Sequence, residues 1–384
     1  MRKPPNTDFY QQRLKAWHPI LTPKYVFPIF FALGLIFMSL GGILLYFSSQ
    51  VHEIIINYTY CDSQASLNEF KSIPSKYVQM SFPSNVQSMN QAIWKKKINE
   101  KSVYSIKEPI CLIRFEIPID LNPPVFLYYR LTNFYQNHRR YVKSFSRDQM
   151  MGRAKTAAEL RSSDDCSPLS VSDNGKPIYP CGLIANSMFN DTISQPKRLA
   201  SLSGEVLEPY FMTNKGISWL SDKNIYRKTS YRPSDVSPPP NWVLRYPNGY
   251  NETNFPNIHD WEEFHVWMKT AGLPTFEKLS LRNDTGIMKA GAYEIEVVMH
   301  FPVTKYNGSK TIIISTRSFI GGRNLFFSIA YIISGALSFI IGSFFTCCYL
   351  IKPRKLGDHR YLSWNQTSFH NPLKSMNIAE TRSR

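Results

Sequence analysis

The sequence lacks the motifs that mark the common enzyme active sites. It contains no phosphate-binding P-loop, no Gly-x-Ser-x-Gly turn and no Cys-x-x-Cys pair. The triplet Asp284-Thr285-Gly286 resembles the surroundings of an aspartic-protease nucleophile, but that chemistry needs two carboxylates and the triplet has no second copy. His259 and His265 fall on different faces of a helix, which favours an ordinary polar surface over a metal site. We therefore predict no catalytic residue, no bound metal and no cofactor.

Acidic residues are also scarce. The 384 residues contain 45 Lys and Arg against 28 Asp and Glu, which gives a formal net charge of +17. One basic stretch, "LTNFYQNHRRYVKS" at 131–144, combines cations with aromatic rings, as nucleic-acid sites do. Whether nucleic acid can be its partner depends on the side of the membrane on which it lies.

Charge is absent from two long runs, residues 25–48 and 325–351, which contain no Asp, Glu, Lys, Arg or His. As helices they would be about 36 to 40 Å long, enough to cross a hydrocarbon core of about 30 Å. The alternative, a pair of buried helices in a soluble protein, rarely provides uncharged runs of this length. The first run is also too long for a signal peptide and has no small-residue cleavage site after it. We predict two transmembrane helices.

The flanking charges predict the orientation of these helices. The outer flanks of the two runs are basic. They carry Arg2, Lys3, Arg13, Lys15 and Lys24 before the first run, and Lys352, Arg354, Lys355 and Arg360 after the second. By the positive-inside rule both termini are cytoplasmic. The chain then divides into a cytoplasmic arm (1–24), a first helix (25–48), a lumenal or extracellular domain (49–324), a second helix (325–351) and a cytoplasmic tail (352–384). Because 131–144 faces the lumen, we exclude nucleic acid as a partner.

The cysteines agree with this topology. Four of the six, Cys61, Cys111, Cys166 and Cys181, lie in the lumenal segment, whereas Cys347 and Cys348 lie at the cytoplasmic end of the second helix. An oxidising compartment favours two disulfides among the four, and three connectivities are possible. We favour the sequential pairing, in which the second loop is short. A zinc site is the competing interpretation, but neither a Cys-x-x-Cys pair nor paired His ligands accompany the cysteines.

N-x-[ST] sequons also gather in the lumenal segment. They occur at Asn57, Asn190, Asn251, Asn283 and Asn307. We predict glycosylation of the last four and expect Asn57, which lies close to the membrane, to stay unmodified. Asn365 matches the pattern on the cytoplasmic side, where it should stay bare.

The lumenal segment has the pattern of one large antiparallel β-rich (α+β) domain, or two closely packed ones, with long loops. Strand-like runs rich in branched and aromatic residues occur at 110–117, 125–131, 293–301 and 310–316. The last two are expected to form a hairpin with a turn at Asn307-Gly308. Residues 260–272 are expected to form a short helix that Gly272 ends.

Two segments are candidates for contacts with a partner. In 131–144 the aromatic residues can pack inside the domain while the cations pair with its own acids, and spacing alone favours this structural role. The alternative is a docking surface that includes Asn133, Tyr135, Arg139 and Arg140. In the second helix, Ser334, Ser338 and Gly342 recur at every fourth residue, a pattern that permits close approach of another helix. Neither transmembrane helix carries a charge that could form a transport path.

The chain resembles the family of cell division control protein 50 and ligand-effect modulators, the accessory subunits of type IV P-type ATPases that act as phospholipid flippases. The stretches that carry the resemblance are "RKPPNTDFYQQRLKAWHPILTP", "YYRLTNFYQNHRRYVKS", "YPCGLIANSMFND", "FPVTKYNGSKTIIISTRSFIGGRNLFFSIAYI" and "KPRKLGDHRYLSW". They are long, unusual and spread over nearly the whole chain.

The resemblance implies a protein that is not itself an enzyme. It would form a hetero-dimer with a large ATPase, help it leave the endoplasmic reticulum and support its phosphorylation cycle. That partner would move phosphatidylserine or phosphatidylethanolamine to the cytosolic leaflet. The expected location is a membrane of the secretory or endocytic pathway: the endoplasmic reticulum, the Golgi, an endosome or the plasma membrane.

The resemblance also implies a role for the cytoplasmic arm, which has too little apolar periodicity to fold alone. We expect it to run along the cytosolic face of the ATPase and to contact it through Asn6, Thr7, Gln11, Gln12, Arg13 and Trp17. The alternative is a basic tail attracted to anionic lipid.

Two other classes of protein share part of this pattern. A subunit of an oligomeric ligand-gated channel has two helices and a large ectodomain, but it needs a polar pore stripe and usually has more disulfides. A membrane-tethered lumenal hydrolase needs a catalytic constellation, which the sequence does not offer.

Overall fold

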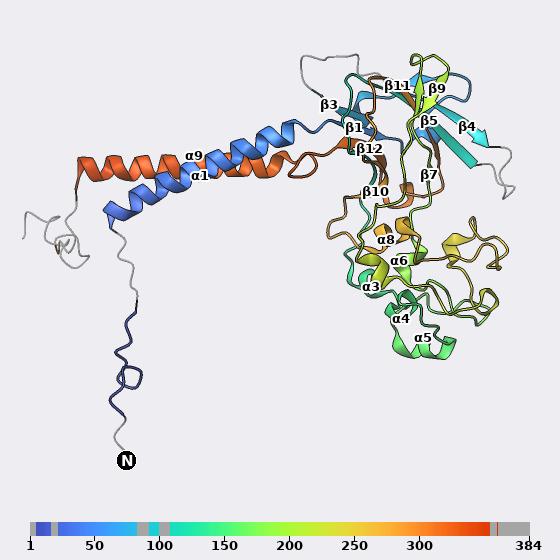
Figure 1. Cartoon of the computed structure of the whole chain (residues 1–384), viewed down its shortest axis with the longest axis horizontal. Helices are drawn as coiled ribbons and strands as arrows, with labels where there is room; N and C mark the ends of the chain where they lie inside the picture. Colours follow the sequence, from blue (N-terminus) through green and yellow to red (C-terminus); the bar gives the residue numbers. More distant parts are fainter. Residues whose placement is uncertain (1–4, 17–21, 83–91, 100–107, 354–358, 360–384) are drawn as a thin grey trace, which may run out of the picture. The chain divides into compact units, whose positions relative to one another are not determined.

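The computed structural model describes residues 5–16, 22–82, 92–99, 108–353 and 359. They belong to two compact units, one made of residues 1–46 and 324–384 and the other of Phe47–Arg323, here called the ectodomain (Figure 1). The first unit contains two candidate membrane helices, and the ectodomain is built on antiparallel strands. The predicted fold class is therefore confirmed.

The two long helices are α1 (Pro23–Ser49) and α9 (Leu325–Ile351). Each has 27 residues and is long and apolar enough to cross a membrane. α1 begins two residues before the predicted run and ends one residue after it, whereas α9 has the predicted bounds. At the start of α9 the Asn324 side chain accepts a hydrogen bond from the backbone N–H of Phe326 at 3.1 Å, which caps the helix.

The first sheet of the ectodomain has five strands in the order β10-β6-β12-β1-β3. Their bounds are β10 (Phe276–Asn283), β6 (Val125–Leu131), β12 (Lys310–Thr316), β1 (Glu53–Asn57) and β3 (Val78–Ser81). All neighbours are antiparallel. The central strand, β12, is buried along its whole length, which explains its continuous apolar run of isoleucines.

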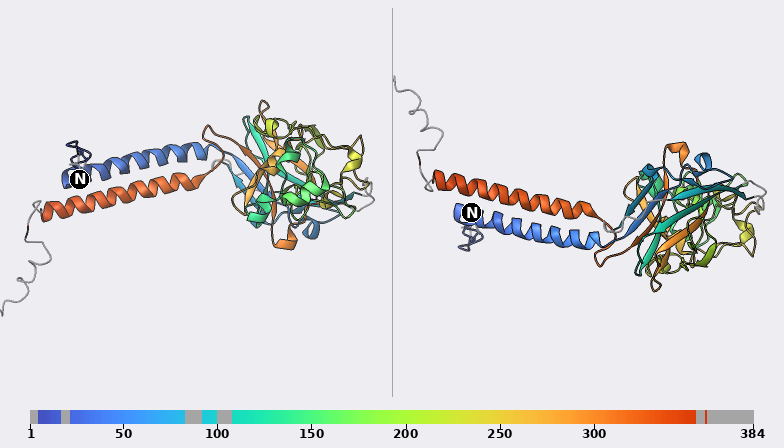
Figure 2. Two further views of the ribbon diagram at one scale, coloured as in Figure 1. Left: turned by 90° about the horizontal axis from the view of Figure 1, so that it is seen from below. Right: turned by 90° about the horizontal axis from the view of Figure 1, so that it is seen from above.

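The second sheet has seven strands, with β2, β4, β5, β11, β8 and β9 in order and β7 also paired to β11. Their bounds are β2 (Lys71–Ser72), β4 (Ile93–Asn99), β5 (Glu108–Ile117), β7 (Thr192–Ile193), β8 (Lys197–Leu199), β9 (Val206–Pro209) and β11 (Gly291–Val298). The two sheets share one hydrophobic core, to which the first contributes Ile54 and Ile312 and the second Trp94, Ile113 and Tyr293. They therefore form a sandwich, of which Figure 2 gives two further views.

A second core lies among the long loops and short helices. The short helices of the ectodomain are α2 (Cys61–Gln64), α3 (Arg139–Lys143), α4 (Arg147–Met150), α5 (Ala157–Ser163), α6 (Leu183–Asn186), α7 (Asp222–Ile225) and α8 (Glu262–Met268). Of these, α2 packs on the first core through Cys61, and α5 packs through Leu160 on a small cluster with Cys166 and Cys181. Aromatic side chains dominate the second core, including Tyr179, Trp242, Phe264 and Trp267. The rings supply the apolar area that such short elements cannot bury by themselves.

The predicted hairpin at 293–316 is wrong. β11 pairs with β5, β7 and β8 in the second sheet, whereas β12 pairs with β1 and β6 in the first. The connection between them contains Pro302, the 3-10 turn Thr304–Tyr306 and Asn307 at a φ of 54°, so it crosses from one sheet to the other. The predicted helix is also shorter than expected, because α8 ends at Met268 and Lys269 is already extended.

Candidate partner-binding surfaces

The segment that follows β6 is divided into an inward and an outward half. Asn133 adopts a left-handed conformation with a φ of 56°, and its side-chain amide donates to the carbonyl of Tyr306. Phe134 is thereby turned into the second core, where its ring meets those of Tyr141, Trp267, Phe276, Phe301 and Tyr306. Phe134 thus has a structural role.

The outward half presents cations and an aromatic ring to solvent. Tyr135 is 56% exposed, and Arg139 and Arg140 are exposed on the first turn of α3. Among the ion pairs of the described residues, none involves either arginine. The expected pairing of these cations with the domain's own acids is therefore wrong. Their charge is available to an acidic surface of a partner.

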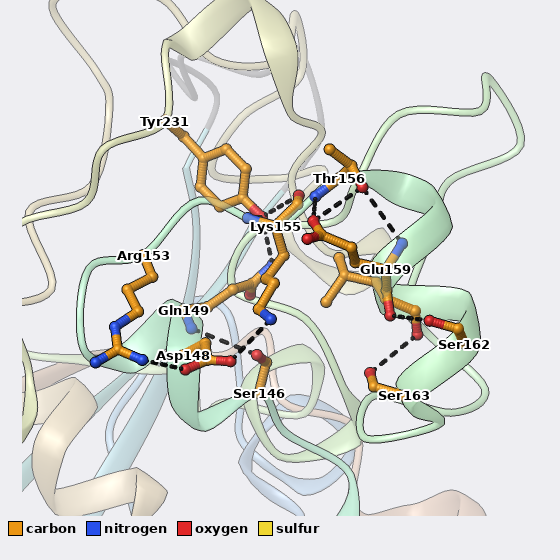
Figure 3. Close-up of polar contacts among 11 residues, drawn as sticks. Ser146, Asp148, Gln149, Arg153, Lys155, Thr156, Glu159, Ser162, Ser163 and Tyr231 are labelled. Atoms are coloured by element: carbon orange, nitrogen blue, oxygen red, sulfur yellow. Dashed lines mark hydrogen bonds and ion pairs between the residues drawn. The ribbon is translucent and has the colours of Figure 1, made fainter.

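A polar network follows α3 in the sequence and involves α4 and the residues before α5 (Figure 3). Gln149 of α4 is fully buried, and its side chain donates to the carbonyl of Ile178 at 3.1 Å and accepts from the N–H of Cys181 at 2.9 Å. The Tyr231 hydroxyl donates to the carbonyl of Lys155 at 2.7 Å and accepts from its N–H at 2.8 Å. These contacts join three segments that are distant in the sequence.

The same network caps α5. The Thr156 hydroxyl accepts from the N–H of Glu159 at 3.3 Å, and the Glu159 carboxylate accepts from the N–H of Thr156 at 2.7 Å. These two bonds form a capping box. The N–H and the hydroxyl of Thr156 both donate to the Glu159 carboxylate and lower its pKa. Beside it, hydrogen bonding to Lys155 lowers the pKa of Asp148. The Thr-x-x-Glu spacing was a readable helix signal that the sequence analysis missed.

Two disulfides are present in the ectodomain. Cys61 is joined to Cys111 and Cys166 to Cys181, which is the sequential pairing. Their Cα atoms are 6.0 and 5.6 Å apart, within the usual range for disulfides. The first bond connects α2 to β5, and the second closes the loop that precedes α6. Cys347 and Cys348 are free and exposed at the end of α9.

The sequon asparagines differ in their surroundings. Asn190, Asn251 and Asn307 are exposed, whereas Asn283 is half-buried and its side-chain amide donates to the carbonyl of Phe211 at 2.8 Å. A glycan on Asn283 would have to replace that bond. Asn57 is half-buried at the end of β1. Glycosylation of the four predicted sites stays a prediction.

The polar surface expected at 259–265 is wrong for two of its residues, His265 and Glu262, which are buried. His265 is fully buried, with Nε2 2.6 Å from the carbonyl oxygen of Ile258, and burial lowers its pKa. Glu262 is also buried and accepts from the N–H of Ser218. Among the described residues, no group of three or more His, Cys, Asp and Glu side chains could hold a metal ion. The histidine has a packing role.

The predicted small residues of α9 do not all lie on the same face of the helix. Gly342 is buried against α1, together with Ser328 and Gly335, and these three residues recur at every seventh position. A Cβ on Gly335 would lie 2.9 Å from the carbonyl oxygen of Gly34 on α1. The line of contact between α1 and α9 is here called the α1–α9 seam. Ser334 is exposed and Ser338 is half-buried, because residues spaced by four rotate around the helix and leave this seam. The structure thus assigns Gly342 to the contact with α1 and leaves Ser334 at the surface.

The described part of the N-terminal arm, residues 5–16, is extended except for one turn. The backbone N–H groups of Gln11 and Arg13 donate to the carbonyls of Thr7 and Asp8, and the Arg13 guanidinium donates to the side chain of Asn6. Gln12 has a φ of 54°. Every residue in this part is exposed. Trp17 lies outside the described residues, and contact of the arm with a partner stays a prediction.

A cavity of about 510 Å³ lies in the ectodomain beside the sequon at Asn190. Its lining combines aromatic rings, such as Trp242 and Trp261, with the polar groups of Asn214, Arg245 and Glu263. Arg245 stacks on the Trp261 ring at 4.3 Å, and Asn214 donates to Glu263 at 2.5 Å. These polar groups are already engaged with their neighbours, so we assign no ligand to the cavity.

Comparison with known proteins supplies the family. Residues 44–355 match the model of the LEM3 (ligand-effect modulator 3) family / CDC50 family. The chain is 42% identical to a "Phospholipid-transporting ATPase accessory subunit CDC50" of Chaetomium thermophilum, over 95% of this chain and 92% of the relative. It is 39% identical to the accessory subunit CRF1 of Saccharomyces cerevisiae, over 95% and 90% of the two chains. It is 37% identical to "Cell cycle control protein 50A" of Bos taurus, over 89% and 87%.

Proposed function

The chain belongs to the LEM3 / CDC50 family, and on that basis we propose that it is the accessory subunit of a phospholipid-transporting P-type ATPase. The observation that carries the proposal is similarity along nearly the whole length of two proteins that are named as such accessory subunits. A domain between two candidate membrane helices fits a subunit that accompanies a membrane pump. A channel subunit, the alternative considered above, gains no support from these relatives.

The proposed subunit contributes binding, not chemistry. ATP hydrolysis and lipid movement would take place in the ATPase, and this chain would stabilise some conformations of its partner more than others. It would also accompany the partner out of the endoplasmic reticulum. The lipids proposed for the complex are phosphatidylserine and phosphatidylethanolamine, moved to the cytosolic leaflet, and both termini of this chain would be cytoplasmic.

Three surfaces are proposed to hold the partner. In the lumen, the unpaired Arg139 and Arg140 would attract an acidic surface of the ATPase, with Tyr135 as an aromatic contact. In the membrane, Ser334 and Ser338 lie away from the α1–α9 seam, where a helix of the ATPase could pack against them. In the cytoplasm, the polar side chains of the exposed N-terminal arm would contact the ATPase.

Purification of the tagged full-length chain in mild detergent tests the proposal. We expect a P-type ATPase to be recovered with it in a one-to-one complex whose ATP hydrolysis is stimulated by phospholipid. Recovery of a homo-oligomer without an ATPase would contradict the proposal and favour a channel-like assembly.

A further inference from the structure

A tight turn directly before α9 presents two apolar side chains to the surroundings of the ectodomain. Phe319 is 94% exposed and Ile320 is 50% exposed. The turn is closed by two reciprocal backbone bonds, from the N–H of Ser318 to the carbonyl of Gly321 at 2.9 Å and in the opposite direction at 3.1 Å. The phenylalanine is therefore held outward by a defined turn.

The side chain of Ser318 and the backbone of Gly321 reinforce this shape. The Ser318 hydroxyl donates to the carbonyl of Gly321 at 3.0 Å. Gly321 has a φ of 137°, a conformation that other residues rarely adopt. A glycine and three hydrogen bonds thus stabilise a turn that exposes a large apolar ring. Exposure of an apolar ring to water is unfavourable.

The covalent chain limits how far this turn can lie from the bilayer. Leu325, the first residue of α9, follows Phe319 by six residues, which can span at most about 20 Å when extended. β12 ends at Thr316, whose N–H donates to the carbonyl of His52 at 3.0 Å, and His52 follows α1 by three residues. Both membrane helices therefore tether this end of the first sheet.

Two arginines flank the turn and supply the charge that suits a phospholipid surface. Arg317 and Arg323 are exposed, and neither takes part in an ion pair among the described residues. Arg323 lies near enough to Glu53 to lower that carboxyl's pKa, although burial raises it more. Guanidinium groups bind phosphate oxygens well, and apolar side chains such as Phe insert at the boundary between the headgroups and the acyl chains.

We propose that the Ser318–Gly321 turn is a lipid-contacting anchor of the ectodomain, with Phe319 and Ile320 in the interface of the lumenal leaflet and the flanking arginines on lipid phosphates. The partner is a phospholipid surface rather than a second protein, because both charge and apolar area match it and the chain confines the turn to its neighbourhood. The proposal rests on the lumenal orientation of the ectodomain in the proposed function. The anchor would fix the height of the ectodomain above the bilayer in which the ATPase moves lipid.

Photo-crosslinking of the full-length chain tests this anchor. A benzophenone amino acid replaces Phe319 in one variant and Leu220, which is 85% exposed elsewhere in the ectodomain, in the matched control. Both are reconstituted in vesicles of phosphatidylcholine and phosphatidylserine, with and without the co-purified ATPase. We expect phospholipid adducts at position 319 in both preparations and none at position 220. The double substitution Arg317→Gln and Arg323→Gln should lower the lipid yield at 319.

The outcomes distinguish lipid from the ATPase as the molecule that contacts the turn. A crosslink from position 319 to the ATPase in place of lipid would overturn the anchor and assign the turn to the subunit interface. Equal lipid yields at positions 319 and 220 would overturn it as well. Failure of the proposed function would appear differently, as an absence of ATPase in the purified sample, and the lipid adducts of the chain alone would still decide the anchor.

Discussion

At the scale of single residues, the ectodomain depends on a buried ion pair between its two layers. Lys310 of β12 donates to Asp191 at 2.6 Å, and the two side chains are 4% and 0% exposed. Asp191 also accepts from the hydroxyl of Tyr58 at 2.9 Å and from the backbone N–H groups of His300 and Phe301, each at 2.6 Å. Burial lowers the pKa of Lys310, and Asp191 opposes that shift. Each charge is tolerated because the other is present.

Asp191→Asn should therefore destabilise the ectodomain strongly. Removing one partner of a buried ion pair costs about 3 to 5 kcal/mol, because the remaining charge stays buried without compensation. The sequon at Asn190 is kept by this change. The matched control is Asp148→Asn, which removes exposed ion pairs to Arg153 and Lys155. Thermal unfolding of both full-length variants in detergent would contradict the prediction if their midpoints fell equally.

His265 should make the ectodomain sensitive to acid. Its folded pKa is lowered by burial, so below about pH 6.5 the unfolded chain takes up a proton that the folded chain resists. Stability from this group is present above about pH 6.5 and is lost as the pH falls toward the folded pKa. We expect His265→Gln to reduce the drop in unfolding midpoint between about pH 7.5 and pH 5.5.

The exposed His138, changed to Gln, serves as the control for that measurement. A His265 variant with the full acid sensitivity of the parent protein would show that other groups carry the effect, of which His52, also with a pKa lowered by burial, is the first candidate.

At the scale of elements, the contact between α1 and α9 depends on glycine. Gly34 and Gly41 on α1 and Gly335 and Gly342 on α9 recur at intervals of seven, the spacing that keeps one face of each helix toward the other. Aromatic rings pack on either side of the glycines, as in the pairs Phe31–Phe339 and Phe37–Tyr331. The small residues allow close backbone approach, and the rings fill the margins of the seam.

Gly335→Leu should push these helices apart. A Cβ at this position would lie 2.6 Å from the Met38 side chain and 2.9 Å from the backbone of both Gly34 and Met38, so the backbone itself would have to move. Gly42→Leu is the control, because no atom lies within 4 Å of its Cβ position.

The readout is disulfide formation between cysteines placed at Phe27 and Tyr349, whose rings are 5.7 Å apart. The native Cys347 and Cys348 are replaced by serine in this background. Gly335→Leu should reduce the crosslink yield and Gly42→Leu should not. Equal yields in the two variants would show that the seam does not need glycine.

At the scale of the whole molecule, the proposed partner contacts are spread over segments that are remote in the sequence. The cations of α3 lie on a helix whose Tyr141 hydroxyl is 2.9 Å from that of Ser187, and the network around Gln149 and Tyr231 (Figure 3) orders the segments after it. The N-terminal arm has one turn and no buried residue among those described. A supported surface suits long-range steering by charge. An exposed arm is expected to gain order when it meets its partner.

Reversal of charge at α3 should weaken the complex. Arg139→Glu with Arg140→Glu leaves the aromatic core untouched, because both side chains are exposed. We expect slower association with the ATPase and a weaker dependence of the rate on salt. The control is Arg153→Glu with Arg161→Glu, two exposed arginines of which the first follows α4 and the second lies in α5. An equal loss of binding in the control would show that the change in net charge, and not the position of the two arginines on α3, causes the effect.

Replacement of the polar residues of the arm should separate docking from lipid attraction. The change of Asn6, Thr7, Gln11 and Gln12 to alanine keeps Arg13, Lys15 and Lys24 and hence the charge. If the arm docks on the ATPase, lipid-stimulated ATP hydrolysis or the stability of the complex should fall. Unchanged hydrolysis by an intact complex would leave the electrostatic role.

The sequence alone determined the features that depend on composition along a continuous segment. Two uncharged runs are enough to predict membrane helices, because the bilayer requires about 20 apolar residues in succession. The strands at 110–117, 125–131 and 310–316 follow from their branched and aromatic residues. The family followed in the same way, from long stretches of characteristic residues.

The tertiary structure decided which of these segments meet. β11 and β12 are neighbours in the sequence but lie in different sheets, because each finds partner strands from elsewhere in the chain. Gln149 and His265 are polar in the sequence and buried in the fold, where backbone groups of Cys181 and Ile258 satisfy them. Whether Arg139 forms an ion pair likewise depends on where the fold places the acidic residues. Such properties depend on contacts between remote residues, and local periodicity carries no information about them.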